Sequence, residues 1–128
     1  IDEWNNARRE HAKTYNELFA GCEDIQTPKE LANTYCVYHQ YTVKIPNRDN
    51  IHKMLQEAGI GAMLYYPVPL HLQKVHAHLG WTKGMLPNTE KDTEMVISLP
   101  MFPELTLEEQ KTVASTLISC IEKSKALA

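Results

Sequence analysis

The sequence is short of clustered cysteines, phosphate-binding glycine loops and long apolar runs, and each shortage excludes a class of protein. Cys22, Cys36 and Cys120 are odd in number and far apart, whereas zinc sites need clustered ligands and disulfide scaffolds need dense, even cysteines. We therefore expect three reduced cysteines and a cytoplasmic location. Neither a GxGxxG nor a Walker sequence occurs, and neither a GxSxG elbow nor a recognisable Cys/His arrangement is found.

The apolar runs and the net charge are equally modest. The longest unbroken apolar run, residues 62–66, is far shorter than the ~20 residues that a membrane-spanning helix needs. The formal net charge is -3 at pH 7, so we expect neither nucleic acid nor a membrane surface as a partner. With 128 residues, 43% of them hydrophobic and 23% charged, the chain is expected to form about one globular domain.

Apolar periodicity predicts a helix near each end of the chain. Residues 4–19 carry apolar side chains at steps of three and four before Gly21, which predicts an amphipathic helix of about five turns. Residues 106–109, Thr-Leu-Glu-Glu, have the form of a capping box. This box opens a final helix with an apolar side within residues 107–121.

Shorter helices are predicted in the middle of the chain. Asn47 and Gly59 bracket a helix, the first as its N-cap and the second as its C-cap. Residues 70–79 are expected to form a short helix before Gly80. One or two further turns are expected at residues 88–94, capped by Asn88.

Three segments have the pattern of strands. Residues 35–45 alternate at period two and end at Pro46, residues 61–66 are a short apolar segment, and residues 96–99 precede Pro100. Only the first two can form a strand–helix–strand unit. We therefore predict an α+β fold with a small three-stranded, mainly antiparallel sheet covered on one face by helices.

The most informative stretch is the proline corner, residues 65–71, with the sequence Tyr-Tyr-Pro-Val-Pro-Leu-His. Proline fixes φ and removes a backbone donor, so two prolines must end the strand abruptly. The chain then leaves the sheet rigidly with two phenols and an imidazole. These three side chains, Tyr65, Tyr66 and His71, are expected either to bind a ligand or to pack the corner.

The remaining histidines suggest less chemistry. His71, His76 and His78 invite a metal hypothesis, but their separations of five, two and seven do not place three ligands on one helix face. No nearby Cys or Asp completes a set, so no metal ligand is predicted. His39 falls on the apolar face of its predicted strand and is expected to be a hydrogen-bonded core residue. Gln40 points to the opposite face, toward solvent or a neighbouring domain.

In their order and spacing, these motifs resemble the C-terminal domain of the DegT/StrS-type sugar-nucleotide aminotransferases, pyridoxal-phosphate enzymes of fold type I (the aspartate-aminotransferase fold). The resemblance runs through the first helix with Arg8 and Tyr15, His39-Gln40-Tyr41, Arg48-Asp49, Gly59-Ile60, residues 66–73, Pro87-Asn88-Thr89-Glu90 and residues 98–105. It implies that residues 1–22 form a connecting helix from a missing large domain and residues 23–128 the small domain. The first residue, an isoleucine rather than a methionine, also suggests a fragment of a longer protein.

The resemblance further implies the activity of the intact parent. Such enzymes move an amino group from glutamate, by way of pyridoxal phosphate, to a keto sugar on a nucleotide, in cell-surface polysaccharide or amino-sugar biosynthesis. Family members are usually homodimers, and their large domain supplies the lysine that binds the cofactor. None of the lysines here lies in that context. The isolated chain is therefore expected to be inactive, with no catalytic, cofactor-binding or metal-binding residue.

The resemblance carries three substrate-binding residues onto this chain. Tyr66 matches a family tyrosine near the sugar-nucleotide site. Tyr65 stands where the family commonly has histidine, although its hydroxyl can still donate a hydrogen bond. His71 matches a frequent family residue. The alternative is a free-standing, non-catalytic α+β ligand-binding or interaction module, because the elements form a self-contained set and the cofactor lysine is absent.

Overall fold

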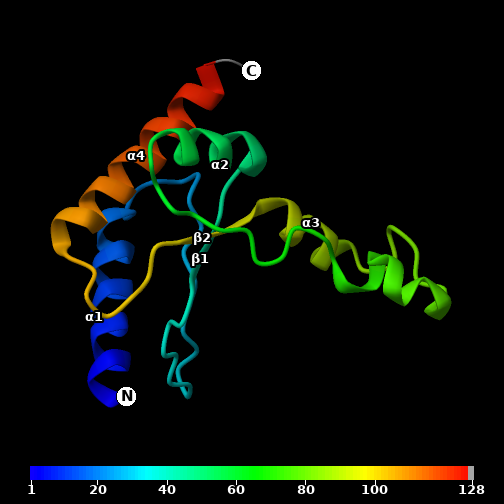
Figure 1. The fold of residues 1–128 in the computed structure, drawn as a ribbon, viewed down its shortest axis with the longest axis horizontal. Coiled ribbons are helices and arrows are strands. Elements are labelled where there is room, and N and C mark those ends of the chain that lie inside the picture. The colour runs from blue at the N-terminus through cyan, green and yellow to red at the C-terminus, as the bar shows by residue number, and fades with distance from the viewer. Residues whose placement is uncertain (127–128) are drawn as a thin grey trace.

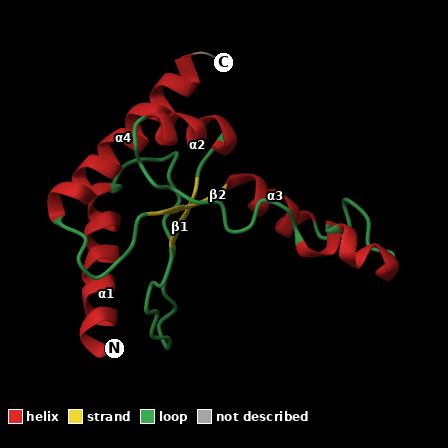
Figure 2. Cartoon of the chain, viewed as in Figure 1, coloured by secondary structure: helices red, strands yellow, loops and turns green. Residues whose placement is uncertain are grey.

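The computed structural model describes residues 1–126, which form a helical body and a projecting arm (Figure 1). In chain order the described elements are α1 (Asp2–Leu18), β1 (Tyr41–Lys44), α2 (Arg48–Glu57), the 3₁₀ helices η1 (Leu70–Leu72) and η2 (Lys74–Leu79), α3 (Pro87–Met95), β2 (Val96–Leu99) and α4 (Leu107–Ala126). Helices α1, α2 and α4 gather around the strands, whereas η1, η2 and α3 lie in an arm, residues 67–95, that extends away from them (Figure 2). The α+β class is confirmed.

The longer helices form where their sequence signals predict. The capping box of α4 is present: Thr106 N donates to Glu109 Oε2 at 2.7 Å, and Glu109 N donates to Thr106 Oγ1 at 3.3 Å. Asn47 precedes α2 as expected, but its side chain does not cap the helix. Instead, Asn47 Nδ2 donates to Ser124 Oγ at 2.6 Å, which ties the start of α2 to α4.

The short helices of the arm differ from their predictions. The single helix expected at residues 70–79 is two 3₁₀ helices, because Gln73 between them takes an extended conformation. Helix α3 begins at Pro87, a favourable first position for proline, and its N-cap position is Leu86 rather than Asn88.

The sheet has two strands rather than the predicted three. Strands β1 and β2 pair antiparallel, with Tyr41 opposite Leu99 and Thr42 opposite Ser98. The expected third strand contributes only Met63, whose backbone exchanges two hydrogen bonds with Ser98, at 2.9 and 2.8 Å. Ile60 N is still bonded to Leu55 O of α2 and Ala62 N is bonded to Ile60 O, and the prolines at 67 and 69 lack an N–H to donate, so only a short stretch between them is available for pairing.

The first predicted strand is also shorter, because side chains bind its beginning. Arg9 Nη1 donates to Cys36 O at 2.6 Å, and Cys36 N donates to Glu30 Oε1 at 2.7 Å, so this backbone is held to α1 instead of to a strand. Tyr38 then has a positive φ of 47°, which breaks the period-two alternation. As a result Tyr38 is buried and His39 is exposed, so the prediction of His39 as a core residue was wrong.

The core lies between one face of the sheet and helices α1, α2 and α4. Tyr15 and Tyr41 stack with ring centroids 5.0 Å apart. Their hydroxyls donate to Pro100 O at 3.1 Å and to Asn16 Oδ1 at 2.6 Å, so both buried phenols are satisfied. Burial raises the pKa of both tyrosines, which therefore remain neutral donors.

The other face of the sheet carries polar and partly exposed side chains. Thr42 and Ser98 stand opposite each other and their hydroxyl oxygens lie 2.8 Å apart. On the same face, Lys44 Nζ pairs with Asp92 Oδ1 of α3 at 2.6 Å. Met63, bridged to Ser98, is half exposed. This face leads directly into the proline corner, and the sequence-predicted site begins there.

Candidate functional site

The structure separates the three side chains of the proline corner, and only Tyr65 faces the sheet. It lines a hollow of about 220 Å³ at the end of the sheet where β1 begins and β2 ends, and we call this hollow the sheet-end pocket. Its other lining residues are His39, Gln40, Gly61, Met63, Ser98, Leu99, Pro100 and Met101. The pocket thus joins residues of three chain segments, 39–40, 61–65 and 98–101, and the antiparallel pairing of β1 with β2 brings the first and the last of these together.

The polar side chains of the sheet-end pocket are available to a ligand. Within residues 1–126, the side chains of His39, Gln40 and Tyr65 make no hydrogen bond. An imidazole, an amide and a phenol therefore surround a lining that also contains two methionines and a proline. Such a mixture suits a small polar molecule that has both hydroxyl groups and carbon-bound hydrogens.

Tyr66 turns away from the pocket. Its side chain is 69% exposed, compared with 40% for Tyr65, and the two rings meet edge to face at a centroid distance of 6.1 Å. The peptide bond that joins them is cis. The side chain of Tyr66 is largely open to solvent, whereas more than half of the Tyr65 side chain is covered. Tyr66 directly precedes Pro67, the first residue of the arm, and directly follows Tyr65, which lines the pocket.

His71 lies in the arm and is buried. Its Nε2 is 3.1 Å from Glu90 Oε1, and its ring packs edge-on against Trp81 at a centroid distance of 6.3 Å. Glu90 also accepts hydrogen bonds from Gly84 N at 2.8 Å and Leu86 N at 3.2 Å. The Gly84 amide is the largest cause of a lowered pKa of the Glu90 carboxyl, and the contact with His71 lowers it further. His71 thus contributes to the structure of the arm.

Sequence reasoning missed two residues here. Glu90 lies in the helix predicted at residues 88–94 and is not among the predicted site residues, yet it is buried and bonded to His71. One sequence signal could have found it. Residues 58–89 contain no aspartate or glutamate, so Glu90 is the first carboxylate that follows His71 along the chain. His39 was missed because its predicted face assumed an unbroken strand, and no local signal marks the positive φ of Tyr38.

The histidines of the arm do not converge. His78 Nδ1 lies 3.1 Å from Val75 O, whereas His71 is engaged by Glu90. Among residues 1–126, no group of three or more His, Cys, Asp or Glu side chains is placed to hold a metal ion. In the same part of the chain, no helix has both the length and the apolar character needed to cross a membrane.

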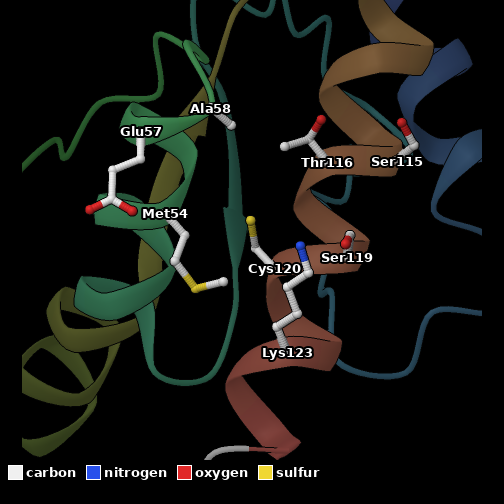
Figure 3. A pocket seen from close by; sticks show the side chains of 8 residues that line it. All are labelled: Met54, Glu57, Ala58, Ser115, Thr116, Ser119, Cys120 and Lys123. Carbon is white, nitrogen blue, oxygen red and sulfur yellow. The ribbon is translucent and has the colours of Figure 1, made fainter.

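A larger groove, of about 580 Å³, lies between α2 and α4 (Figure 3). Met54 projects from α2, and Cys120 and Lys123 project from α4, toward the same gap, and Glu57 of α2 also lines the groove. The other lining residues are Ala58, Ser115, Thr116 and Ser119. This groove belongs to the helical layer and includes none of the sequence-predicted site residues, so the sheet-end pocket and the adjoining corner remain the candidate site.

Comparison with known proteins places this geometry in a family. The model of the DegT/DnrJ/EryC1/StrS aminotransferase family matches residues 1–118. A pleiotropic regulatory protein of Geobacillus stearothermophilus is 47% identical over 91% of this chain and 32% of its own length. UDP-N-acetyl-3-dehydro-alpha-D-glucosamine 3-aminotransferase of Acidithiobacillus ferrooxidans is 39% identical over 89% of this chain and 30% of its own length.

A solved structure gives the same result. The crystal structure of S. venezuelae DesV in complex with a ketimine intermediate superposes with a TM-score of 0.89 at 32% sequence identity. The match covers 94% of this chain and 33% of DesV. The chain therefore spans about a third of the length of the relatives that it matches.

Proposed function

The chain belongs to the DegT/DnrJ/EryC1/StrS aminotransferase family, and from this premise we propose that it is the small domain of a sugar-nucleotide aminotransferase. The observation that carries the proposal is the agreement of sequence and fold over nearly the whole chain with relatives of that activity. One of these relatives is named as an aminotransferase of a UDP-linked sugar. In the proposal, the parent protein transfers an amino group to a keto sugar on a nucleotide.

The domain division that we propose rests on the family resemblance. In the proposal, residues 1–22 lead from a large domain and residues 23–128 form the small domain. Helix α1 would connect the two domains. Tyr15 and Phe19, at and just after its C-terminal end, are buried in the core of the body, while its N-terminal turn is exposed. The outer face of the sheet and the proline corner would then face the rest of the protein.

Pyridoxal phosphate is the cofactor that we propose for the parent. When bound, this cofactor acts as the electron sink of amino transfer, and a lysine holds it. The residues that line the sheet-end pocket include no lysine, so they do not fit the covalent attachment of the cofactor. We assign that attachment to the part of the parent outside this chain, and we propose glutamate as amino donor, a homodimer and a cytoplasmic location, as the resemblance implies.

The proposed task of this chain is to bind substrate. Tyr65 and Tyr66 would form one wall of the site, because both phenols are exposed and make no hydrogen bond within residues 1–126. The prolines at 67 and 69 hold this wall in place by restricting φ. His71 would act indirectly, through the buried contact with Glu90 that shapes the arm.

A second candidate function is regulatory ligand binding without catalysis. It is favoured by one observation: the relative with 47% identity is named as a regulatory protein. The two candidates differ in the cofactor lysine, which only an aminotransferase requires.

Spectroscopy of the complete protein distinguishes the candidates. The aminotransferase proposal expects that the product of the full reading frame shows the visible absorbance of lysine-bound pyridoxal phosphate and that glutamate removes this absorbance. A protein that binds nucleotide sugars without such absorbance would support the regulatory candidate instead. A reading frame of only these 128 residues would contradict the proposed division into domains.

A further inference from the structure

Three hydrogen-bonding side chains with no partner meet in the sheet-end pocket. His39 and Gln40 precede β1, and Tyr65 comes from a segment more than twenty residues further along the chain. None of the three makes a side-chain hydrogen bond within residues 1–126. Other histidines of the body are engaged: His11 Nε2 lies 3.0 Å from Pro103 O, and His52 Nε2 lies 3.0 Å from Ala62 O. The pocket therefore brings together three hydrogen-bonding side chains that are not bonded to any other group within residues 1–126.

The fold fixes the backbone next to these groups. Gln40 immediately precedes Tyr41, whose ring is fully buried and whose hydroxyl is bonded to Asn16. Tyr65 follows Met63 by two residues, and the backbone of Met63 is paired with Ser98. Both sides of the pocket are thus anchored to the sheet, as a selective binding site requires.

The chemistry of the lining points to a sugar ring. A pyranose presents hydroxyl groups around its edge and C–H groups on its faces, and the pocket offers Gln40 and Tyr65 beside the apolar side chains of Met63, Met101 and Pro100. An amide both donates and accepts, which matches a hydroxyl group that does the same. No lysine or arginine lines the pocket, so it lacks the groups that would favour a diphosphate.

We propose that the sheet-end pocket binds the sugar ring of the nucleotide-linked substrate, and that Gln40 is a residue that determines which sugar is accepted. This inference rests on the proposed function and deepens it. The amide of Gln40 hydrogen-bonds a ring hydroxyl, and the hydroxyl of Tyr65 supplies a second contact from another chain segment of the lining. The nucleotide and its diphosphate lie outside the pocket.

Calorimetric binding to the complete protein tests the proposal. The affinities of UDP-N-acetylglucosamine and dTDP-glucose are compared with those of UDP and dTDP, so that the contribution of the sugar is measured separately. We expect Gln40→Leu to weaken binding of the better nucleotide sugar about three- to tenfold, the loss of one neutral hydrogen bond, and to leave nucleotide affinity unchanged. Tyr65→Phe, which keeps the ring, is expected to reduce the same sugar contribution.

Gln56→Leu is the matched control, because Gln56 is exposed on α2 away from the pocket. It is expected to leave every affinity unchanged. The proposal is overturned if the sugar adds nothing to wild-type affinity, if Gln40→Leu has no effect, or if it weakens nucleotides and nucleotide sugars equally. The visible absorbance of the same samples shows whether this inference or the proposed function has failed. If the absorbance is present but Gln40→Leu leaves the sugar contribution unaffected, only this inference is rejected. If the absorbance is missing, the proposed function on which it rests is rejected.

Discussion

Glu90 organises the loop of the arm through a single carboxylate. Its oxygens accept hydrogen bonds from the backbone amides of Gly84 and Leu86, and they contact the buried imidazole of His71. A carboxylate offers several acceptor positions, so it can satisfy these groups together. The loop between η2 and α3 has no strand or helix of its own, and it therefore depends on this residue.

This dependence predicts a pH-sensitive arm. The pKa of Glu90 is lowered in the folded protein from an ordinary value of 4.5. A lowered pKa means that the contribution of the carboxylate is fully present above about pH 4.5 and is lost as the pH falls through the folded pKa. We expect the Gly84 and Leu86 amides to lose protection from hydrogen exchange under acid, several-fold more than the amides of the core.

Glu90→Gln provides the control for that prediction. The amide places an N–H group where the Gly84 amide now donates, so the variant is expected to exchange quickly at these two positions even at neutral pH. Exchange followed by NMR from about pH 6 to about pH 3 measures both effects. If the acid-induced loss at Gly84 persists unchanged in the variant, another group is responsible for it.

Tyr66→Phe tests the corner at the same scale. The hydroxyl of Tyr66 has no partner within residues 1–126 and its side chain is 69% exposed, so its removal should change stability by less than about 0.5 kcal/mol. In the complete protein we expect kcat/KM for the sugar nucleotide to fall about three- to tenfold. Tyr35→Phe, at another exposed tyrosine, is expected to leave the kinetics unchanged. Equal kinetics for wild type and Tyr66→Phe would remove Tyr66 from the site.

The individual residues show which parts of a site can be predicted from sequence. Tyr65 and Tyr66 lie at the end of the sheet because two prolines end the extended segment after them, a local effect visible in the sequence. The position of His71 depends on Glu90, which lies 19 residues further along the chain. Contacts at such a separation leave no periodic signal. The sequence therefore suggests one site for His71 and the tyrosines, whereas in the structure His71 lies apart from them, against Glu90.

At the level of elements, local signals predicted the long helices of the body and strand β2 well, and the other two strands and the short helices of the arm poorly. Helices α1 and α4 follow apolar periodicity, and the capping box fixes the start of α4. The strand expected from residue 35 fails because Arg9 and Glu30 bind the backbone of Cys36. Helix formation depends on neighbours within one turn, whereas strand pairing depends on distant partners, and those are not visible in a single sequence.

Helix α4 carries the largest testable contribution to stability. Leu117 is fully buried against the core, whereas Leu107 on the same helix is 53% exposed. We expect Leu117→Ala to lower the free energy of unfolding by about 2–5 kcal/mol, from lost burial and the cavity that remains. Leu107→Ala is expected to change it by less than about 1 kcal/mol. Urea unfolding measures both, and similar losses for the two variants would contradict this packing.

For the whole molecule, the distribution of apolar surface separates the body from the arm. The body buries its apolar side chains in one core between the sheet and three helices. The arm exposes Leu70, Val75, Leu79, Trp81 and Met85, and His71 and Glu90 are the residues that it buries. The body therefore carries the hydrophobic core, whereas the arm leaves much of its apolar surface exposed.

This separation predicts the behaviour of the isolated 128-residue chain. We expect it to unfold cooperatively in urea, because its core is complete, and to show no amino transfer from glutamate, because no lysine lines the candidate site. Pyridoxal phosphate added to the chain should be removed by dialysis, whereas the complete protein should retain it. Transfer by the isolated chain above the rate of free pyridoxal phosphate would contradict the proposal. Lys44, which lies on the outer face of the sheet in a pair with Asp92, would then be the first lysine to replace.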